Sequence, residues 1–219
     1  AVFSSGTTAQ TSPAVSPDGS KLVFVESAAD CDVVSVDLAT AAVTRLIATQ
    51  RSEMMPAWAS QEPALVYLTD RNGAPEIWLH KPGQQERPLV TARDFPDTTQ
   101  WIMGPSLSPD ATRVIYTRNE RNGPIQLWMS AVAGGAPVRL VKASADGDYA
   151  GSWSPDGNWF VYWHFTQAGK VSLNKVKTTG QAEPEVVKAD VRRAGSWVPV
   201  WSPSGEWILH HDGGAKLTS

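Results

Sequence analysis

The sequence of 219 residues predicts an all-β fold, a β-propeller built from four-stranded antiparallel blades. Three observations support this prediction: a short sequence frame occurs five times, an apolar run rich in β-branched and aromatic residues follows each copy, and no segment has sustained helical periodicity. The frames start near residues 13, 56, 105, 151 and 199, at the spacing of propeller blades. We therefore expect residues 1–219 to form a single propeller domain.

Each frame begins with Pro or Gly, continues with a small and an apolar residue, and ends in a turn related to Ser-Pro-Asp-Gly. The five copies span residues 13–19, 56–62, 105–111, 151–157 and 199–205, and the second copy has lost the turn motif. Pro fixes φ and Gly tolerates positive φ, so the motif predicts a tight turn between the first and second strands of a blade. Asp18, Asp110 and Asp156 recur in these turns, where we expect them to cap the backbone rather than to catalyse.

The strands follow each frame in a fixed order. The second strands are predicted at apolar runs without alternation, which is typical of strands buried on both faces: residues 22–25, 65–68, 114–117, 160–163 and 208–211. Asn-Gly pairs at 72–73 and 122–123 predict hairpins into the third strands. Third strands are expected at residues 33–36, 76–79, 126–129 and 170–173, and fourth strands at 43–47, 87–90, 138–141 and 185–187.

The two ends of the chain predict how the ring closes. After its second strand, the fifth blade has a turn at residues 212–214 and a third strand at 215–219, but it has no fourth strand. Residues 1–4 lie about ten residues before their frame, where the other blades have a fourth strand. We expect this N-terminal strand to pair with the C-terminal blade and close a ring of five blades. The alternative is that the chain is a fragment of a longer ring.

The Ser-Pro-Asp-Gly turn followed by an aromatic-rich strand resembles the repeat of the TolB-like, WD-repeat-like β-propeller family, and the resemblance covers essentially the whole chain. It implies a bacterial protein of the periplasm or the extracellular space, with partners bound on one face of the disc or across its central opening. TolB-like propellers commonly have six blades, which keeps the fragment alternative open. Similar repeats occur in TolB, in sensor segments of receptor kinases and in gating propellers of prolyl-oligopeptidase-type enzymes, so the motif specifies the fold and not the function.

Composition and motifs argue against several classes of function. A net charge of −3 and a pI near 5.8 disfavour a nucleic-acid partner, which needs clustered Lys and Arg. No apolar run approaches the roughly 18 residues of a membrane span. The sequence has no Gly-x-Ser-x-Gly elbow of a serine hydrolase, and no cofactor is expected. We therefore expect a non-enzymatic module, with an accessory propeller of a prolyl-oligopeptidase-type peptidase as one alternative.

Histidines provide the other alternative, a metal-dependent lyase or hydrolase. His164 and His210 are the candidate metal ligands, and Asp148 and Asp212 could join them if the side chains converge. However, His210 occupies the position of an aromatic core residue in the other repeats, and the adjacent His211 points to the opposite face of the strand. A structural role for these histidines is therefore the preferred interpretation.

The segments that lead into the first strands predict a binding surface. In propellers these loops surround the mouth of the central channel, and Trp, Tyr and Met are enriched at binding surfaces. The expected aromatic and thioether residues at this mouth are Met54, Trp101, Tyr149 and Trp197, and the expected rim residues are Arg71, Arg118 and Arg121. Packing between blades would also account for these side chains. The sequence thus predicts a propeller that binds a protein or small-molecule ligand at its channel mouth.

Overall fold

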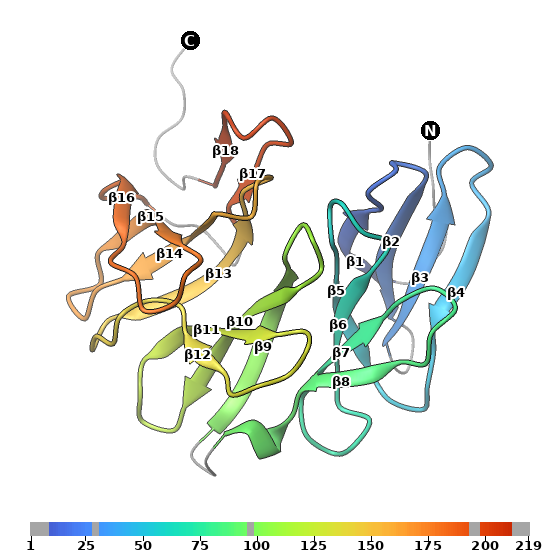
Figure 1. Ribbon diagram of the computed structural model, residues 1–219, viewed down its shortest axis with the longest axis horizontal. Helices are drawn as coiled ribbons and strands as arrows, with labels where there is room; N and C mark the ends of the chain where they lie inside the picture. Colours follow the sequence, from blue (N-terminus) through green and yellow to red (C-terminus); the bar gives the residue numbers. More distant parts are fainter. Residues whose placement is uncertain (1–8, 28–30, 96–98, 193–197, 212–219) are drawn as a thin grey trace.

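The computed structural model describes residues 9–27, 31–95, 99–192 and 198–211, whose strands form four four-stranded sheets and one two-stranded sheet (Figure 1). Within these sheets the strands pair antiparallel and each pairing joins consecutive strands, which confirms the predicted four-stranded antiparallel blades. In the described part of the chain, no helix is long and apolar enough to cross a membrane.

The strands follow the order expected from the repeats. The first sheet contains β1 (Ala9–Val15), β2 (Lys21–Ser27), β3 (Cys31–Asp37) and β4 (Val43–Ile47). The second contains β5 (Glu53–Trp58), β6 (Leu65–Thr69), β7 (Glu76–His80) and β8 (Arg87–Val90), and a short 3-10 helix, η1 (Ala92–Asp94), follows it. The third contains β9 (Thr99–Leu107), β10 (Arg113–Glu120), β11 (Ile125–Ala131) and β12 (Val138–Arg139). The fourth contains β13 (Gly147–Trp153), β14 (Trp159–Phe165), β15 (Val171–Lys177) and β16 (Glu185–Lys188), and the last contains β17 (Val200–Trp201) and β18 (Ile208–Leu209).

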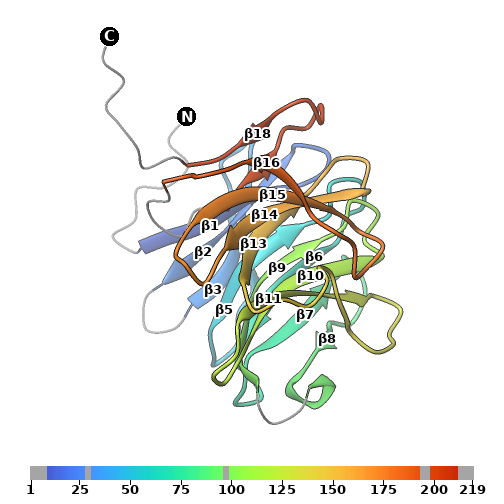
Figure 2. The same ribbon diagram turned by 90° about the vertical axis from the view of Figure 1, so that its left-hand side faces the viewer.

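The sheets follow one another along an arc, from β1–β4 at one end to β17–β18 at the other (Figure 1). The first strands of successive sheets contact each other in the order β1, β5, β9, β13 and β17, so these strands line the inside of the arc. Figure 2 shows the arc from the side of the fourth sheet, with β16 and β18 close to the viewer. The strands expected to close the ring, at residues 1–4 and 215–219, lie outside the described residues, and closure as five blades stays a prediction.

The Ser-Pro-Asp-Gly turns have the structure that the sequence predicts. In the first turn, the Ser16 hydroxyl donates a hydrogen bond of 2.6 Å to Asp18, and the Ser20 backbone N–H donates one of 3.0 Å to the same carboxylate oxygen. The final glycine of the motif, Gly19, has a φ of 69°. The Ser108 and Ser154 hydroxyls donate equivalent hydrogen bonds to the carboxylates of Asp110 and Asp156. The recurring aspartates therefore cap their own turns.

Packing between sheets buries the second strands. Equivalent aliphatic residues of the four complete sheets are 0% exposed, and these residues are Val23, Val66, Ile115 and Val161. Each belongs to a cluster that joins its sheet to the next one along the chain. The equivalent residue of the last sheet, Leu209, is 70% exposed, and no further sheet follows it among the described residues. The core of the molecule therefore lies between blades, as in other propellers.

Candidate functional site

A β-bulge interrupts the first strand of every complete sheet at the same position of the repeat. The residue directly before each frame has a positive φ: Ser12 (55°), Met55 (52°), Gly104 (60°) and Ala150 (38°). The strand register shifts at these places in β1, β5, β9 and β13. A positive φ is costly for residues other than Gly, and bulges often re-aim side chains beside functional sites. The inner strands therefore carry a repeated backbone distortion.

Two predicted mouth residues directly precede this bulge. Met54 and Tyr149 are half-buried and lie next to the positive-φ residue of β5 and β13. The Tyr149 hydroxyl donates a hydrogen bond of 3.3 Å to the Met103 sulfur, and the Gly104 N–H donates one of 3.3 Å to the Met55 sulfur. These contacts join the first strands of adjacent sheets. Met103 occupies the same repeat position as Met54 and Tyr149, and counting back two residues from the start of each frame would have selected it.

Of the two tryptophans predicted at the mouth, Trp101 and Trp197, only Trp101 lies within the described residues. Trp101 is half-buried and lines a hollow of about 100 Å³ together with Pro75, Thr91 and Phe95, at the boundary between the second and third sheets. It lies three residues before the bulge of β9, so it does not share the repeat position of Met54 and Tyr149. Trp197 lies outside the described residues, and its place at the mouth stays a prediction.

The predicted rim arginines differ in their surroundings. Arg71 is partly buried, with its guanidinium carbon 4.2 Å from the ring centre of Trp78, and it forms ion pairs with Glu53 (3.7 Å) and Glu86 (3.4 Å). All three partners belong to the second blade, so Arg71 contributes to the packing of this blade. Its role at the rim stays a prediction.

Arg118 is not an exposed rim residue. Its side chain is 2% exposed, and its guanidinium carbon lies 4.4 Å from the ring centre of Phe95 and 4.9 Å from that of Trp128. A salt bridge of 2.8 Å to Glu120 accompanies this stacking. Cation–π packing on Phe95 and Trp128 buries the guanidinium, so Arg118, predicted as a rim residue, is part of the packed interior. Arg121, in the turn between β10 and β11, is exposed as expected.

A buried carboxylate begins two of the inner strands. Glu53 is 0% exposed and accepts a hydrogen bond of 2.6 Å from the Thr49 hydroxyl. Asp148 is 4% exposed and lies 2.9 Å from Nδ1 of His164, whose Nε2 lies 3.6 Å from Asp146. Burial raises the pKa of the Asp148 carboxyl, while the hydrogen bond to Asp148 raises the pKa of the His164 imidazole. His164 is therefore held in an ion-pair arrangement across β13 and β14.

His210, the other candidate metal ligand, lies in a different setting. Its ring contacts Trp163 edge-on, with ring centres 5.9 Å apart, and its Nδ1 atom is buried without a hydrogen-bond partner among the described residues. Within residues 9–27, 31–95, 99–192 and 198–211, no group of three or more His, Cys, Asp or Glu residues is arranged to hold a metal ion. Asp212 lies outside the described residues. The structural role expected for His164 and His210, and the alternative of metal binding, both stay predictions.

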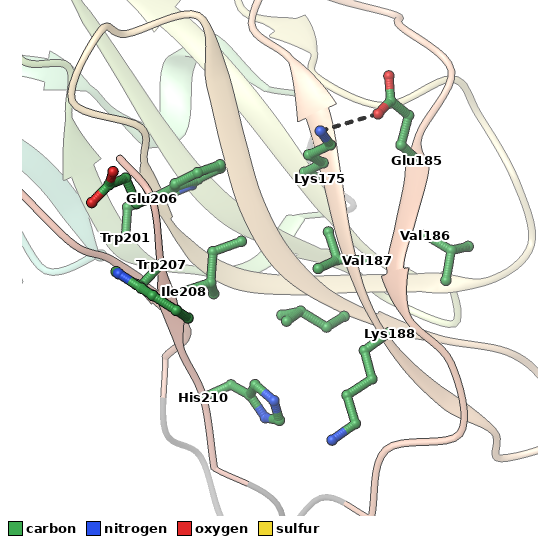
Figure 3. Close-up of a pocket in the computed structure, with 11 residues that line it drawn as sticks. Lys175, Glu185, Val186, Val187, Lys188, Trp201, Glu206, Trp207, Ile208 and His210 are labelled. Carbon is green, nitrogen blue, oxygen red and sulfur yellow. Dashed lines mark ion pairs between the residues drawn. The ribbon is translucent and has the colours of Figure 1, made fainter. Parts of the chain in front are cut away.

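A larger cleft lies between the outer strand of the fourth sheet and the last hairpin (Figure 3). Its volume is about 620 Å³. Apolar side chains from both sheets line it, and they are Leu173, Val186, Val187, Trp201, Trp207 and Ile208. Lys188 and His210 lie toward one end of the cleft, while Glu206 and the Lys175–Glu185 ion pair of 3.2 Å lie toward the other. The sequence did not single out this cleft, because it depends on how two sheets meet.

Comparison with solved structures places the fold among several propellers. The chain superposes on TolB from Acinetobacter baumannii with a TM-score of 0.73 and 20% identity, covering 96% of the chain and 51% of that structure. An oligogalacturonate lyase in complex with manganese gives a TM-score of 0.71 at 15% identity, with 94% of the chain and 59% of the lyase covered. A puromycin-hydrolyzing peptidase of Mycobacterium tuberculosis gives 0.62 at 20% identity, with 84% and 29% covered. At these identities the likeness shows the fold alone.

Sequence comparison identifies the family. YidR of Escherichia coli K12, described only as an uncharacterized protein, is 28% identical over 110 residues, which are 49% of this chain and 25% of YidR. The chain thus matches a quarter of this relative and spans about half the length of the Acinetobacter TolB. The family model of the TolB beta propeller domain matches residues 1–211. The chain therefore belongs to the TolB beta propeller domain family.

Proposed function

We propose that the chain is a non-catalytic binding module of the bacterial cell envelope, which recognises a protein or small-molecule ligand at the bulges of β5, β9 and β13. The observation that carries this proposal is the repeated bulge of the inner strands. It sets the half-buried side chains of Met54, Met103 and Tyr149 at one repeat position on three adjacent sheets. Adaptable thioethers and an amphipathic aromatic ring suit molecular recognition. A periplasmic location is proposed from the resemblance to TolB.

Peptide selection on the immobilised chain tests this site. A displayed peptide library is selected on the wild-type chain, and the recovered peptides are measured against Met54→Lys and Tyr149→Lys. The control is Gln84→Lys, an exposed position in the turn between β7 and β8, at the opposite end of the strands. We expect each mouth variant to weaken binding at least about tenfold, or about 1.4 kcal/mol, and the control to leave it unchanged. Peptides that bind all four proteins equally would exclude the mouth as the site.

A second candidate is an accessory propeller of a peptidase. The likeness to the Mycobacterium tuberculosis peptidase supports it, because the chain covers only 29% of that protein and would be one part of such an enzyme. In this case the catalytic residues would belong to another domain. Sequencing the complete reading frame decides the matter: a hydrolase domain would favour this candidate, and a kinase or DNA-binding domain would exclude it.

A further inference from the structure

Two Asn-Gly pairs occupy turns between the second and third strands of a blade. Asn72 and Gly73 lie between β6 and β7, and Asn122 and Gly123 lie between β10 and β11. An arginine precedes each pair, and both asparagines are exposed. Because glycine has no side chain to shield its backbone nitrogen, an asparagine side chain that precedes glycine can reach this nitrogen closely. The two turns thus place the same reactive sequence in two different surroundings.

Hydrogen bonds hold the first pair in place. The side-chain amide of Asn72 donates a hydrogen bond of 2.8 Å to Oε2 of Glu76, a residue that is 7% exposed. The indole N–H of Trp78 donates a second hydrogen bond of 2.8 Å to the same oxygen. The Gly73 backbone N–H donates one of 2.8 Å to the Asp70 carbonyl. The side chain of Asn72 must therefore leave a buried carboxylate before it can turn toward Gly73.

The second pair has no such anchor. Within the described part of the chain, the side chain of Asn122 makes no hydrogen bond. Its φ of 62° lies in the left-handed region, which asparagine tolerates better than most residues. The Gly123 N–H donates a hydrogen bond of 3.1 Å to the Glu120 carbonyl, which is longer than the equivalent bond of Gly73. Asn122 can therefore approach the following backbone nitrogen without first losing a side-chain partner.

We propose that Asn122 is a site of spontaneous deamidation and that the anchor of Asn72 protects the first pair. The backbone nitrogen of Gly123 attacks Cγ of Asn122 and loses its proton. A carbon–nitrogen bond forms, and the side-chain nitrogen of Asn122 leaves as ammonia. Water then opens the cyclic succinimide at either carbonyl, which leaves aspartate or isoaspartate at position 122. The reaction consumes only water and needs no oxidant, reductant or partner protein.

The product changes the charge and the length of the turn. It adds a carboxylate beside Arg121, the exposed arginine predicted at the rim. The isoaspartate form also adds a carbon to the backbone close to Glu120, whose carboxylate pairs with the buried Arg118. Deamidation thus alters the electrostatics at the end of β10, and its site is separate from the bulges of the inner strands.

Mass spectrometry of the aged protein tests the proposal. The full chain is incubated at mildly alkaline pH, either folded in buffer or unfolded in urea. Tandem mass spectrometry of its peptides then measures conversion at Asn72 and Asn122 separately. In urea both asparagines should react at similar rates, because each has Arg before it and Gly after it. In the folded chain Asn122 should react at least about fivefold faster, which is the effect of one additional hydrogen bond at Asn72.

The variant Asn122→Gly is the matched control. Glycine adopts positive φ readily, so the variant keeps the turn and removes only the reactive amide. Isoelectric focusing of the folded proteins should show acidic species that accumulate in the wild type and not in this variant. A rate at Asn122 no higher than that at Asn72 in the folded chain would overturn the proposal. Acidic species that accumulate equally in the wild type and the variant would overturn it as well.

Discussion

Gly151 is the position where a single methyl group should disturb the fold most directly. A Cβ atom on Gly151 would lie 1.9 Å from the carbonyl oxygen of Val161 and 2.5 Å from a ring carbon of Phe160. Both atoms belong to β14, the neighbouring strand in the core of the fourth blade. We expect Gly151→Ala to destabilise the protein by about 2–3 kcal/mol, since β14 must shift to accommodate it. This corresponds to a drop of roughly 5–10 °C in Tm.

The control for this substitution lies in the same strand. Gly147, also in β13, has no atom closer than 3.8 Å to the position of an added Cβ. Gly147→Ala should therefore leave the thermal melt within about 2 °C of the wild type, as expected of a substitution without steric conflict. Equal melting of the two variants would mean that β13 and β14 do not approach each other as the structure shows.

Arg118 illustrates which properties of a residue the sequence does not reveal. The repeat predicts a second strand at residues 114–117 and puts Arg118 in the turn that follows it, whereas β10 extends through Arg118 to Glu120. The sequence does not reveal the direction of its side chain, because that direction depends on Phe95, which follows η1 between the second and third sheets, and on Trp128 of the neighbouring strand β11. Charged residues are rarely buried without a partner, so an exposed arginine was the natural expectation. Two aromatic faces and the carboxylate of Glu120 reverse that expectation here.

The Ser-Pro-Asp-Gly turns connect the stability of a repeated element to pH. The Ser16 hydroxyl and the Ser20 backbone N–H donate to Asp18 and lower the pKa of its carboxyl to about 2. The Ser154 hydroxyl and the Asn158 backbone N–H likewise lower the pKa of Asp156. A carboxyl with a pKa depressed by folding stabilises the folded state above its unfolded pKa of about 4 and loses this effect as the pH falls through its folded pKa. We expect the free energy of unfolding to fall between about pH 4 and pH 2.

The double variant Asp18→Asn and Asp156→Asn tests this dependence. It should be less stable than the wild type at pH 7, and its stability should change less between pH 5 and pH 3, as measured by urea unfolding. Asp190→Asn serves as the control, because Asp190 is exposed and lies outside these turns. The control should keep the acid dependence of the wild type. If the double variant kept it as well, the turn carboxylates would not be its source.

The inner strands show the limit of sequence reasoning at the scale of an element. Their positions were predictable from the frames, but the bulges were not, because Met55 and Ala150 are residue types that rarely adopt a positive φ. The turn between the first and second strands of the second blade, which lacks the Ser-Pro-Asp-Gly motif, also has a structure that the sequence did not predict. Gln61 replaces the capping aspartate, and it donates its backbone N–H to the carbonyl of Pro109 (3.0 Å) and its side-chain amide to that of Pro155 (3.1 Å). Contacts between blades thus replace a local motif that the sequence had lost.

At the scale of the whole molecule, the periodicity of the sequence predicted the architecture. The positions of side chains at the mouth and in the cleft depended on how the sheets pack against one another. The repeat predicted four-stranded antiparallel blades, and the four complete sheets confirm them. Met54 and Tyr149, which the mouth prediction selected, share one repeat position with Met103, which it missed, whereas Trp101 lies three residues before the bulge of β9 and lines a hollow between the second and third sheets. The cleft between the fourth sheet and the last hairpin could not be predicted, because its lining residues come from two sheets that lie apart in the sequence.

Ring closure is the prediction that concerns the molecule as a whole. If residues 1–4 complete the last blade, they join the two ends of the arc, where Val15 is 52% exposed and Leu209 is 70% exposed. Phe3→Asp should then place a charge in a blade and lower Tm by about 5 °C or more, while Ser5→Asp should leave it unchanged. Equal melts for both variants, together with self-association in size-exclusion chromatography, would contradict closure. In that case each end of the arc would be a surface for additional blades, and the channel mouth would have to be described with those blades included.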